Sequence, residues 1–407
     1  MNDQTDVLIV GGGLNGGTLA LALSQAGLRV TLADAAPRPP RESAGFDGRS
    51  YALAIASTRV LAALGLWAHL RSDAQPILDI KVSDGKRGEA PSPFVLHFDH
   101  AEIEEGPMGH MVEDRHLRPV LMSALNESDV DQRFDTRVIS QEEVPGGIKA
   151  TFANGHSLIA KVLIGADGKL SGTAKRAGIK RLSWQYDQTA LVAAIRHEKP
   201  NNGVAHQLFL PAGPLAILPL KGNRVSIVWS ERGEDAKRIN ALDEDAYLDH
   251  LRPLFGDFLG DIQLDGARFS YPLGLTLAHS FIGPRTALLG DAAHAVHPIA
   301  GQGLNAGLRD IAALAEVLIE AARRGEDIGN PGVLARYQQW RRFDATSLAV
   351  ATDAFNRLFS NDNGVLRAVR DLGLGAVNAL PGLRRSFMRE AAGLTGDLPR
   401  LAKGQPL

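Results

Sequence analysis

The stretch GGGLNG, residues 11–16, decides the fold of this chain. It follows the continuous apolar run VLIV at 7–10, which is typical of a buried strand. Good helix formers fill 14–26, and Gly27 stands where a C-cap glycine ends a helix. A second strand is predicted for VTL at 30–32. Strand, glycine turn, helix and strand form a βαβ unit, and G-x-G-x-x-G at its turn is the spacing of dinucleotide-binding folds.

The glycines of this motif each have a physical role in binding a dinucleotide. Gly11 permits the tight turn, Gly13 lets the backbone approach a pyrophosphate, and Gly16 lets the helix pack closely on the strand. The helix N-terminus adds unpaired N–H groups and a partial positive charge. Asp34 ends the second strand, where it can accept a hydrogen bond from a ribose hydroxyl. FAD and NAD both carry a free 2′-hydroxyl, so the motif does not choose between them.

A second glycine-rich stretch, GDAAHAVHPIAGQGLNAGLRD at 290–310, predicts another part of the ligand site. Asp291 follows the short buried run TALL and therefore projects from a strand end, where open parallel sheets bind ligands. Pro298 stiffens the loop, the G-Q-G at 301–303 allows close approach of the backbone, and a long helix begins at Leu304. We therefore expect Asp291 and this helix N-terminus to face the same ligand.

The composition excludes several classes of protein. The 407 residues carry a net charge of −2, without the basic excess of a nucleic-acid binder, so no nucleic-acid partner is expected. The absence of cysteine excludes disulfides, thiolate catalysis and cysteine-ligated metals. No apolar run is long enough to span a membrane, and we expect no signal peptide before Val7. His294 and His297 lie in a loop because of Pro298, so no metal site is predicted.

The middle and end of the chain show three further patterns. Helices are expected over 49–70 and 112–126, and a hairpin turns at 154–155 before a strand that ends in GADG. Four strand-like runs between about 184 and 272 predict an antiparallel sheet. From 303 onward the pattern is helical almost to the end.

These motifs resemble those of the single-component FAD-dependent aromatic hydroxylases, the fold group of p-hydroxybenzoate hydroxylase. That group carries three fingerprints in order: G-x-G-x-x-G, a central D-G and a late G-D. Here they are Gly11 to Gly16, Asp167-Gly168 and Gly290-Asp291. Within the group, several stretches are similar to the ubiquinone-biosynthesis hydroxylases, the UbiH/UbiF/VisC branch. These are DGRSYALAIASTRVLAALGLW at 47–67, MVEDRHLRPVL at 111–121, WQYDQTALVA at 184–193, GPLAILPL at 213–220, HPIAGQGLNAGLRD at 297–310 and GLRRSFMREAAGLTGDLPRL at 382–401.

The resemblance implies an α/β fold with a Rossmann-like FAD-binding domain, an inserted and mainly antiparallel β-sheet substrate domain, and a helical C-terminal region. The expected boundaries are 1–75, 101–182 and 273–330 for the FAD-binding domain, 76–100 and 183–272 for the substrate domain, and 331–407 for the helical region.

The resemblance also implies the residues of the site. The cofactor-binding residues are Gly11, Gly13, Gly16, Asp34, Arg49, Val138, Asp167, Asp291, Gly301, Gly303, Leu304 and Asn305. Arg49 contacts the flavin or pyrophosphate, Val138 touches adenine through its backbone, and Asp291 binds the ribityl chain. The helix that begins near Leu304 presents N–H groups to the flavin and stabilises its anionic reduced form by about 0.3–1 kcal/mol. Pro298 lies beside the reacting flavin carbon, with no side-chain acid or base assigned.

One departure from the family pattern concerns the central motif. The family's D-G continues through Ser to an Arg, whereas this chain reads DGKLSGTAKR at 167–176. Ala174 stands where the Arg is expected, and Lys175 and Arg176 follow it. No second G-x-G-x-x-G is present, so NAD(P)H binds transiently or another donor supplies the electrons.

The implied reaction is hydroxylation of the ring of a polyprenylated phenol in ubiquinone biosynthesis, with O₂ as co-substrate, through a flavin C4a-hydroperoxide. His206, Tyr186 and Tyr271 are candidates for the base that takes the phenol proton. A flavin hydroxylase of another aromatic compound is the alternative. A non-catalytic prenyl-binding protein on the same fold is a third interpretation, against which the intact Asp291 argues.

The implied substrate partitions into membranes, so we expect a cytoplasmic enzyme that associates peripherally with the inner membrane or with a multi-enzyme complex. Segment 382–407 carries Arg384, Arg385, Arg389 and Arg400 among apolar residues, which suits a membrane-binding or partner-binding helix or a solvated amphipathic one. The C-terminal helices permit a homodimer without requiring one.

Overall fold

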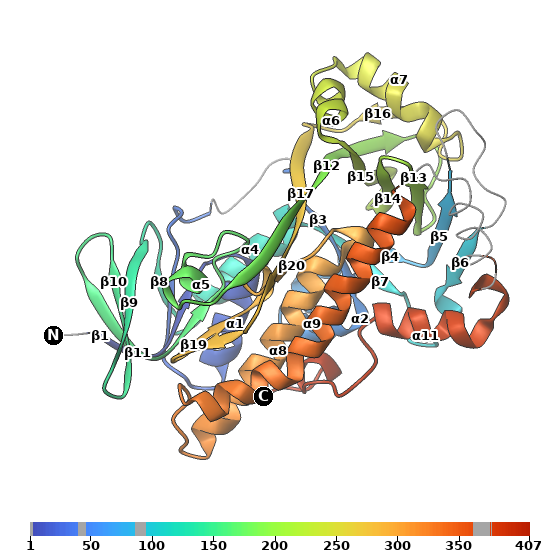
Figure 1. The fold of residues 1–407 in the computed structure, drawn as a ribbon. Coiled ribbons are helices and arrows are strands. Elements are labelled where there is room, and N and C mark those ends of the chain that lie inside the picture. The colour runs from blue at the N-terminus through green and yellow to red at the C-terminus, as the bar shows by residue number, and fades with distance from the viewer. Residues whose placement is uncertain (1–2, 40–45, 86–94, 361–374, 376) are drawn as a thin grey trace.

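The computed structural model describes residues 3–39, 46–85, 95–360, 375 and 377–407 (Figure 1). Its first sheet is mainly parallel and starts from the predicted βαβ unit. The strand order is β18 (Ile282–Gly283), β19 (Thr286–Leu288), β11 (Ser157–Gly165), β1 (Asp3–Val10), β2 (Val30–Ala33) and β8 (Asp131–Arg133), with β10 (Gly147–Phe152) and β9 (Val138–Val144) added antiparallel beside β11. Helix α1 (Leu14–Gln25) connects β1 to β2 and packs against α4 (Asp114–Asn126) and α8 (Gln302–Arg323).

The register of the parallel strands brings three sequence motifs to one edge of this sheet. Val10 is paired with both Ala33 and Gly165, and Gly165 is paired with Leu288. The dinucleotide motif and Asp34 directly follow Val10 and Ala33, and the central D-G and the late G-D begin two residues after Gly165 and Leu288. They therefore meet at the carboxyl edge, which confirms the predicted Rossmann-like arrangement.

The second sheet is mainly antiparallel, as predicted. Its order is β20 (His294–Ala295), β17 (Phe269–Ala278), β12 (Arg181–His197), β15 (Arg224–Arg232), β14 (Gly213–Leu220), β13 (Val204–Leu210), β5 (Asp79–Asp84) and β6 (Leu96–Asp99), with β16 (Ile262–Leu264) beside β12. Among the strands that the structure describes in this sheet, β13 and β5 alone pair in parallel. The boundaries expected near 182 and 272 fall within β12 and β17, which run from the first-sheet region to the far end of the molecule (Figure 1). The domain limits stay a prediction.

The two faces of the second sheet pack against different parts of the chain. Helices α6 (Gly233–Asn240) and α7 (Glu244–Phe255) cover one face, where Leu191, Ile217 and Ile227 are buried with Leu251. We name the opposite face the inner face. It carries Ala190, Val192, Ala194, Ala216, Leu218, Ser226 and Val228, which the strand register places side by side. This alternation follows from the strand pleat, because successive side chains point to opposite faces.

A small third sheet corrects one expectation. It consists of β3 (Ser50–Ala54), β7 (Gly109–Glu113) and β4 (Gln75–Ile77), followed in the chain after β3 by α2 (Ile55–Ala63) and α3 (Trp67–Leu70). The helix expected over 49–70 is therefore wrong for residues 50–54. They pair antiparallel with β7, and this tertiary pairing overrides the helix propensity of alanine and leucine.

The C-terminal part is helical, as expected. It contains α9 (Pro331–Phe359), α11 (Pro381–Ala391) and the 3₁₀ turn η4 (Leu401–Lys403). The remaining short elements are α5 (Gly172–Arg176), η1 (His100–Glu102), η2 (Gly290–Ala292) and η3 (Ile299–Gly301). The Asn330 side chain accepts a hydrogen bond from the N–H of Gly332 at 2.8 Å and caps α9. Among the described helices none is long and apolar enough to cross a bilayer.

Candidate active site

The glycines of the dinucleotide motif differ in what surrounds them. Gly11 has φ +110°, and a Cβ there would lie 2.4 Å from the carbonyl oxygen of Ala166. A Cβ on Gly16 would lie 1.9 Å from the carbonyl oxygen of Gly11. A Cβ on Gly13 would have no neighbour within 4 Å. The first and third glycines are therefore required by packing, while the second faces open space where a pyrophosphate can approach.

Asp34 is held at the strand end by the backbone. Its carboxylate accepts hydrogen bonds from the N–H groups of Gly12 and of Ala36, the latter at 2.7 Å. Val138 begins β9 and is buried with Val10 and Ala33 beside the same strand ends. The two residues expected at the adenosine end thus lie near the motif.

Arg49 lies between two carboxylates. Its Nη2 is 2.5 Å from Asp47 Oδ2 and 3.4 Å from Asp114 Oδ2. Asp114 is buried, and it also accepts hydrogen bonds from Tyr51 Oη and Arg118 Nε, each at 2.8 Å. Burial acts to lower the pKa of Arg49, but Asp114 and Asp47 outweigh it and raise the pKa. Arg49 therefore stays cationic and half-exposed, as a partner for an anionic ligand must be.

Side-chain hydrogen bonds hold the loop of the central D-G motif in place. The Asp167 carboxylate accepts from Ser171 Oγ, and from the N–H and Oγ1 of Thr173 at 2.9 Å each. Ala174, where the family has Arg, is fully buried in the core. Arg176 instead reaches back and donates to Thr173 Oγ1 at 3.1 Å. Burial lowers the pKa of Arg176, and the nearby Asp167 opposes that shift.

Asn15 joins the first and last fingerprints, a contact that the sequence analysis missed. A Cβ on Gly290 would lie 2.3 Å from Asn15 Nδ2, and one on Gly307 would lie 2.5 Å from Asn15 Oδ1. The side chain of Asn15 in α1 therefore fills the space that two glycines of the 290–310 stretch leave open. This packing explains why position 307, inside α8, is a glycine.

A buried charge cluster holds the late G-D loop. The Asp310 carboxylate accepts from Gly290 N at 2.9 Å, His294 Nε2 at 2.6 Å and Arg341 Nε at 2.9 Å. Burial acts to raise the pKa of Asp310, but His294 and Arg341 outweigh it and hold the pKa well below its usual range. His294 is thus hydrogen-bonded to Asp310, and no cluster of metal-ligating side chains occurs among the described residues.

Asp291 and the start of α8 provide the remaining cofactor groups. Asp291 is accessible to solvent. Partial desolvation of its carboxylate by the surrounding protein raises its pKa, while His294 and Lys169 act to lower it. Gly301 (φ +63°) is the N-cap of α8 without a side-chain cap, and a Cβ on Gly303 would meet nothing within 4 Å. The first turn of α8 contains no acidic residue, so its N–H groups suit an anionic ligand near Gly303.

Asn305 anchors this helix N-terminus. Its side chain accepts from Ala54 N at 2.9 Å and Ser57 Oγ at 2.6 Å, and donates to the carbonyl oxygens of Ala52 at 2.8 Å and Gly301 at 3.0 Å. All its side-chain capacity is used by the protein, so Asn305 fixes the helix rather than offering its amide to a ligand. Leu304 is partly buried and packs against the hydrophobic core that contains the buried residues of α1 and α8.

Pro298 begins the turn that leads into this helix. It is exposed, and its carbonyl oxygen accepts the N–H of Gly301 at 3.0 Å. Gly13 and Asp291 follow strands at the carboxyl edge of the first sheet, Gly303 lies in the first turn of α8, and the cationic Arg49 lies in the loop before β3. These residues fit FAD.

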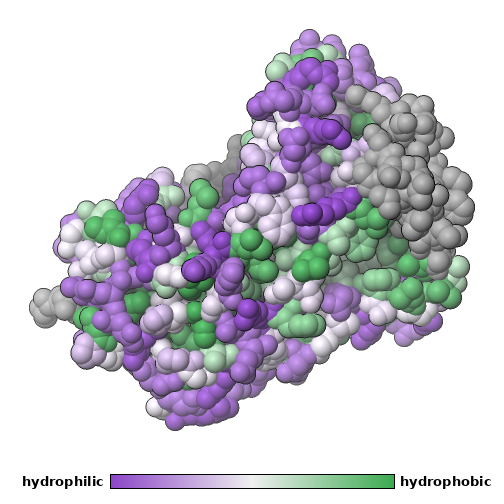
Figure 2. All heavy atoms as spheres, in the orientation of Figure 1, coloured by the Kyte–Doolittle hydropathy of each residue, from purple (hydrophilic) through white to green (hydrophobic). Residues whose placement is uncertain are grey.

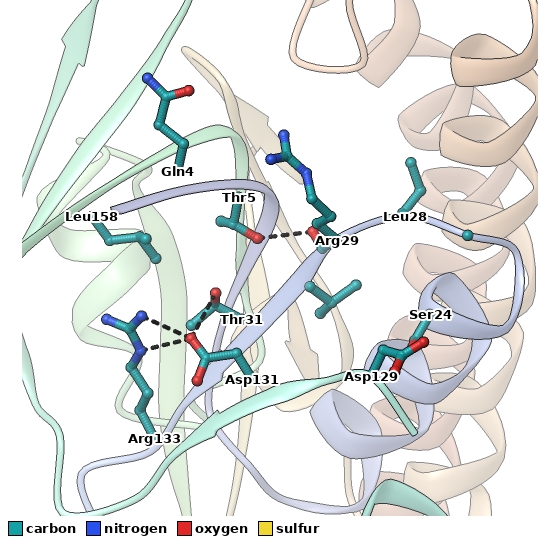
Figure 3. A pocket seen from close by; sticks show the side chains of 12 residues that line it. Gln4, Thr5, Ser24, Leu28, Arg29, Thr31, Asp129, Asp131, Arg133 and Leu158 are labelled. Carbon is teal, nitrogen blue, oxygen red and sulfur yellow. Dashed lines mark hydrogen bonds and ion pairs between the residues drawn. The ribbon is translucent and has the colours of Figure 1, made fainter. Parts of the chain in front are cut away.

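The hollow shown in Figure 3 lies at the other end of the first sheet. It measures about 340 Å³ and is lined by residues such as Thr5, Arg29, Asp131 and Arg133 at the amino ends of the strands. Its polar groups are paired with each other, for example Arg133 Nε with Asp131 Oδ2 at 2.8 Å. This hollow therefore has no part in the candidate site.

The inner face of the second sheet lies next to β3. Ser50 Oγ, at the start of β3, donates to Ser226 Oγ on the inner face at 3.0 Å. Tyr186 packs against the cluster of Ala190 and Val192 on this face, and Tyr271 is paired with Ala190. His206 points to the opposite face, where its ring lies 4.4 Å from that of Phe258. His206 therefore points away from the inner face, where the substrate is expected.

Comparisons with known proteins agree with this geometry. The FAD binding domain family model matches residues 4–351. The chain is 45% identical to the ubiquinone hydroxylase UbiL of Rhodospirillum rubrum, over 99% of this chain and 93% of that protein. It is 34% identical to the 3-demethoxyubiquinol 3-hydroxylase of Escherichia coli, over 97% of this chain and 100% of that protein.

A solved structure shares the fold. The p-nitrophenol 4-monooxygenase PnpA of Pseudomonas putida has a TM-score of 0.78 at 21% identity, covering 97% of this chain and 99% of that one. The chain thus belongs to the FAD-binding-domain family of flavin-dependent aromatic hydroxylases, in its ubiquinone-biosynthesis branch.

Proposed function

We propose that this protein hydroxylates the aromatic ring of a polyprenylated phenol in ubiquinone biosynthesis. The observation that carries the proposal is the meeting of three fingerprints at one sheet edge, next to an apolar inner face. The substrates named for the relatives from R. rubrum and E. coli belong to the same class. A substrate with a polar ring and a long apolar tail matches a site whose one end is polar and whose other end is apolar.

The protein's own residues bind, orient and exclude water. Bound FAD supplies the oxidising chemistry, with O₂ as co-substrate and with NAD(P)H or another donor as reductant. The α8 N-terminus at Gly303 and Leu304 and the cationic Arg49 favour an anionic cofactor. The inner face takes the apolar tail and keeps water from the reacting ring.

Two measurements test the function. In cells that lack the protein and grow with oxygen, ubiquinone is expected to disappear and a prenylated phenol to accumulate, both detected by mass spectrometry. The purified protein, loaded with FAD and given ¹⁸O₂, is expected to add one heavy oxygen atom to a short-chain prenylphenol. A normal quinone profile together with no heavy product would overturn the proposal and leave another aromatic compound as the substrate.

The location and partners of the enzyme form a second part of the proposal. Hydrophobic side chains gather over α9 and α11 on the face shown in Figure 2. On α11, Leu383 and Phe387 are exposed beside the exposed Arg385 and Arg389. This pattern supports the proposal that the enzyme is cytoplasmic and rests on the membrane surface through α11. Flotation with anionic lipid vesicles tests it, and Leu383→Ser with Phe387→Ser is expected to abolish flotation; a homodimer or a multi-enzyme complex is the alternative use of the surface.

A further inference from the structure

His297 is a buried polar side chain that the cofactor motifs do not use. It follows β20 and directly precedes Pro298, and its exposed fraction is 0%. Neither Nδ1 nor Nε2 has a hydrogen-bond partner in the part of the chain that the structure describes. Buried polar atoms are costly when unpaired and are rarely left so, which indicates that His297 binds a further group.

The surroundings of His297 show where that group enters. The ring of Tyr186 meets the ring of His297 edge to face, with their centroids 5.3 Å apart. The hydroxyl of Tyr186 donates to Asp353 Oδ1 at 2.8 Å, so this donor is already engaged. Tyr186 also packs against the inner-face cluster that contains Ala190 and Val192. His297 therefore lies where the inner face meets the loop that leads into α8.

The protonation state of His297 narrows the chemistry of its partner. Burial lowers the pKa of His297 to about 4, and Asp353 opposes that shift. The imidazole is therefore neutral at neutral pH, with one N–H donor and one nitrogen acceptor. A hydroxyl group on an aromatic ring, which both donates and accepts, complements such a neutral imidazole.

We propose that His297 binds the ring hydroxyl of the substrate, an inference that rests on the proposed function. The ring oxygen then lies next to the loop of Pro298, and the isoprenoid tail lies along the inner face against Ala216, Leu218 and Val228. These three residues are only partly buried, so the tail would cover apolar surface that they expose. Because His297 is fully covered, the Tyr186 ring has to turn for the hydroxyl to reach it.

The test compares a short-chain prenylphenol with its methyl ether, which lacks the hydroxyl proton. Each is titrated into the FAD-loaded protein, and the dissociation constant is read from the change in flavin absorbance. The wild type is expected to bind the phenol about tenfold more tightly than the ether, and His297→Phe is expected to bind both equally. His297→Asn, which keeps a donor and an acceptor, is expected to retain part of the preference.

His206→Phe is the matched control. The pKa of His206 is also lowered to about 4 by burial, but His206 lies on the face of the second sheet opposite the inner face, against Phe258. This variant is expected to keep the full preference for the phenol. FAD content and melting temperature are recorded for each variant, and if His297→Phe does not hold FAD, His297→Leu replaces it.

The outcomes separate the two proposals. An undiminished preference in the apolar His297 variants would overturn the role of His297. Failure of the wild type to bind or hydroxylate the phenol would instead overturn the proposed function.

Discussion

The cofactor end and the substrate end of this active site are built in opposite ways. At the cofactor end, Asp167, Asp310 and Asn305 each make three or four hydrogen bonds that fix loops and a helix N-terminus. At the substrate end the inner face is apolar, and His297 is a buried polar group without a partner among the described residues. A cofactor that stays bound needs fixed backbone groups, whereas a substrate that must enter and leave needs apolar surface and a few polar contacts.

The largest effect is expected at the buried charge cluster of the cofactor end. Asp310→Asn removes the charge that pairs with His294 and Arg341, both of which are buried. The loss is expected to lower the free energy of unfolding by about 3–5 kcal/mol, because the buried Arg341 then keeps Asp344 alone as a carboxylate partner. Chemical denaturation of the purified variant measures it. A change below ~1 kcal/mol would mean that this end is not held by the cluster.

The glycine motif allows a matched pair of substitutions. Gly16→Ala is expected to lower the free energy of unfolding by ~3 kcal/mol, because its Cβ would lie 1.9 Å from a backbone oxygen of Gly11. Gly13→Ala is expected to leave the apoprotein stable but to weaken FAD binding, because its Cβ enters open space used by the pyrophosphate. Denaturation of the apoprotein and FAD titration separate the two effects. Equal losses of stability in both variants would contradict this division of roles.

His297, in the loop after β20, and the partly buried His206 of β13 give a pH dependence with a definite sign. His297 and His206 both have pKa values lowered to about 4 from 6.5 by burial, with Lys81 adding to the shift at His206. Between pH 6.5 and about pH 4, the two histidines are protonated in the unfolded chain but not in the folded protein. The free energy of unfolding therefore falls as the pH drops through this window.

Replacing either histidine is expected to make that fall shallower. His297→Asn and His206→Phe should each remove up to about 2 kcal/mol of the loss between pH 7 and pH 5. Denaturation at several pH values measures the slope. Both histidines titrate alike, but His297 alone is expected to affect the preference for a phenol. A slope unchanged in both variants would show that folding lowers the pKa of neither histidine.

The part of the site that the sequence predicts is the part fixed by local backbone geometry. The βαβ unit, the turn at Gly11 and the strand-end positions of Asp34 and Asp291 follow from spacing alone, since strand, turn and helix are neighbours in sequence. The contacts of Asn15 with Gly290 and Gly307 join residues far apart in the chain, and no spacing rule connects them.

The features that the sequence does not predict have a physical cause of the same kind. The sequence names His206 as a possible base, but strand register decides which face of the sheet it occupies, and a shift of one residue reverses the face. The local propensity of residues 50–54 favours a helix. Their pairing with β7, which makes them a strand, cannot be read from that propensity.

The smallest expected effect tests whether the departure at the central motif is compensated. Arg176→Ala removes the hydrogen bond to Thr173 Oγ1 and the positive charge near Asp167. We expect FAD affinity to fall about tenfold, ~1.4 kcal/mol, because the D-G loop loses a support rather than a direct ligand. Lys175→Ala is the control, since Lys175 is exposed, and its FAD affinity should equal that of the wild type.

An arginine at position 174, where the family pattern has one, is not expected to increase FAD affinity. Ala174→Arg places a long cation where the side chain is fully buried in the core, so it is expected to destabilise the protein rather than tighten FAD binding. If Ala174→Arg instead rescued the affinity of Arg176→Ala, position 174 would face the cofactor, and Arg176 would be an ordinary helix-end residue. If it does not, the cofactor end has kept its charge near Asp167 by moving the arginine two residues along the chain. The polar end of the site would then tolerate a change of sequence position as long as the paired geometry is preserved.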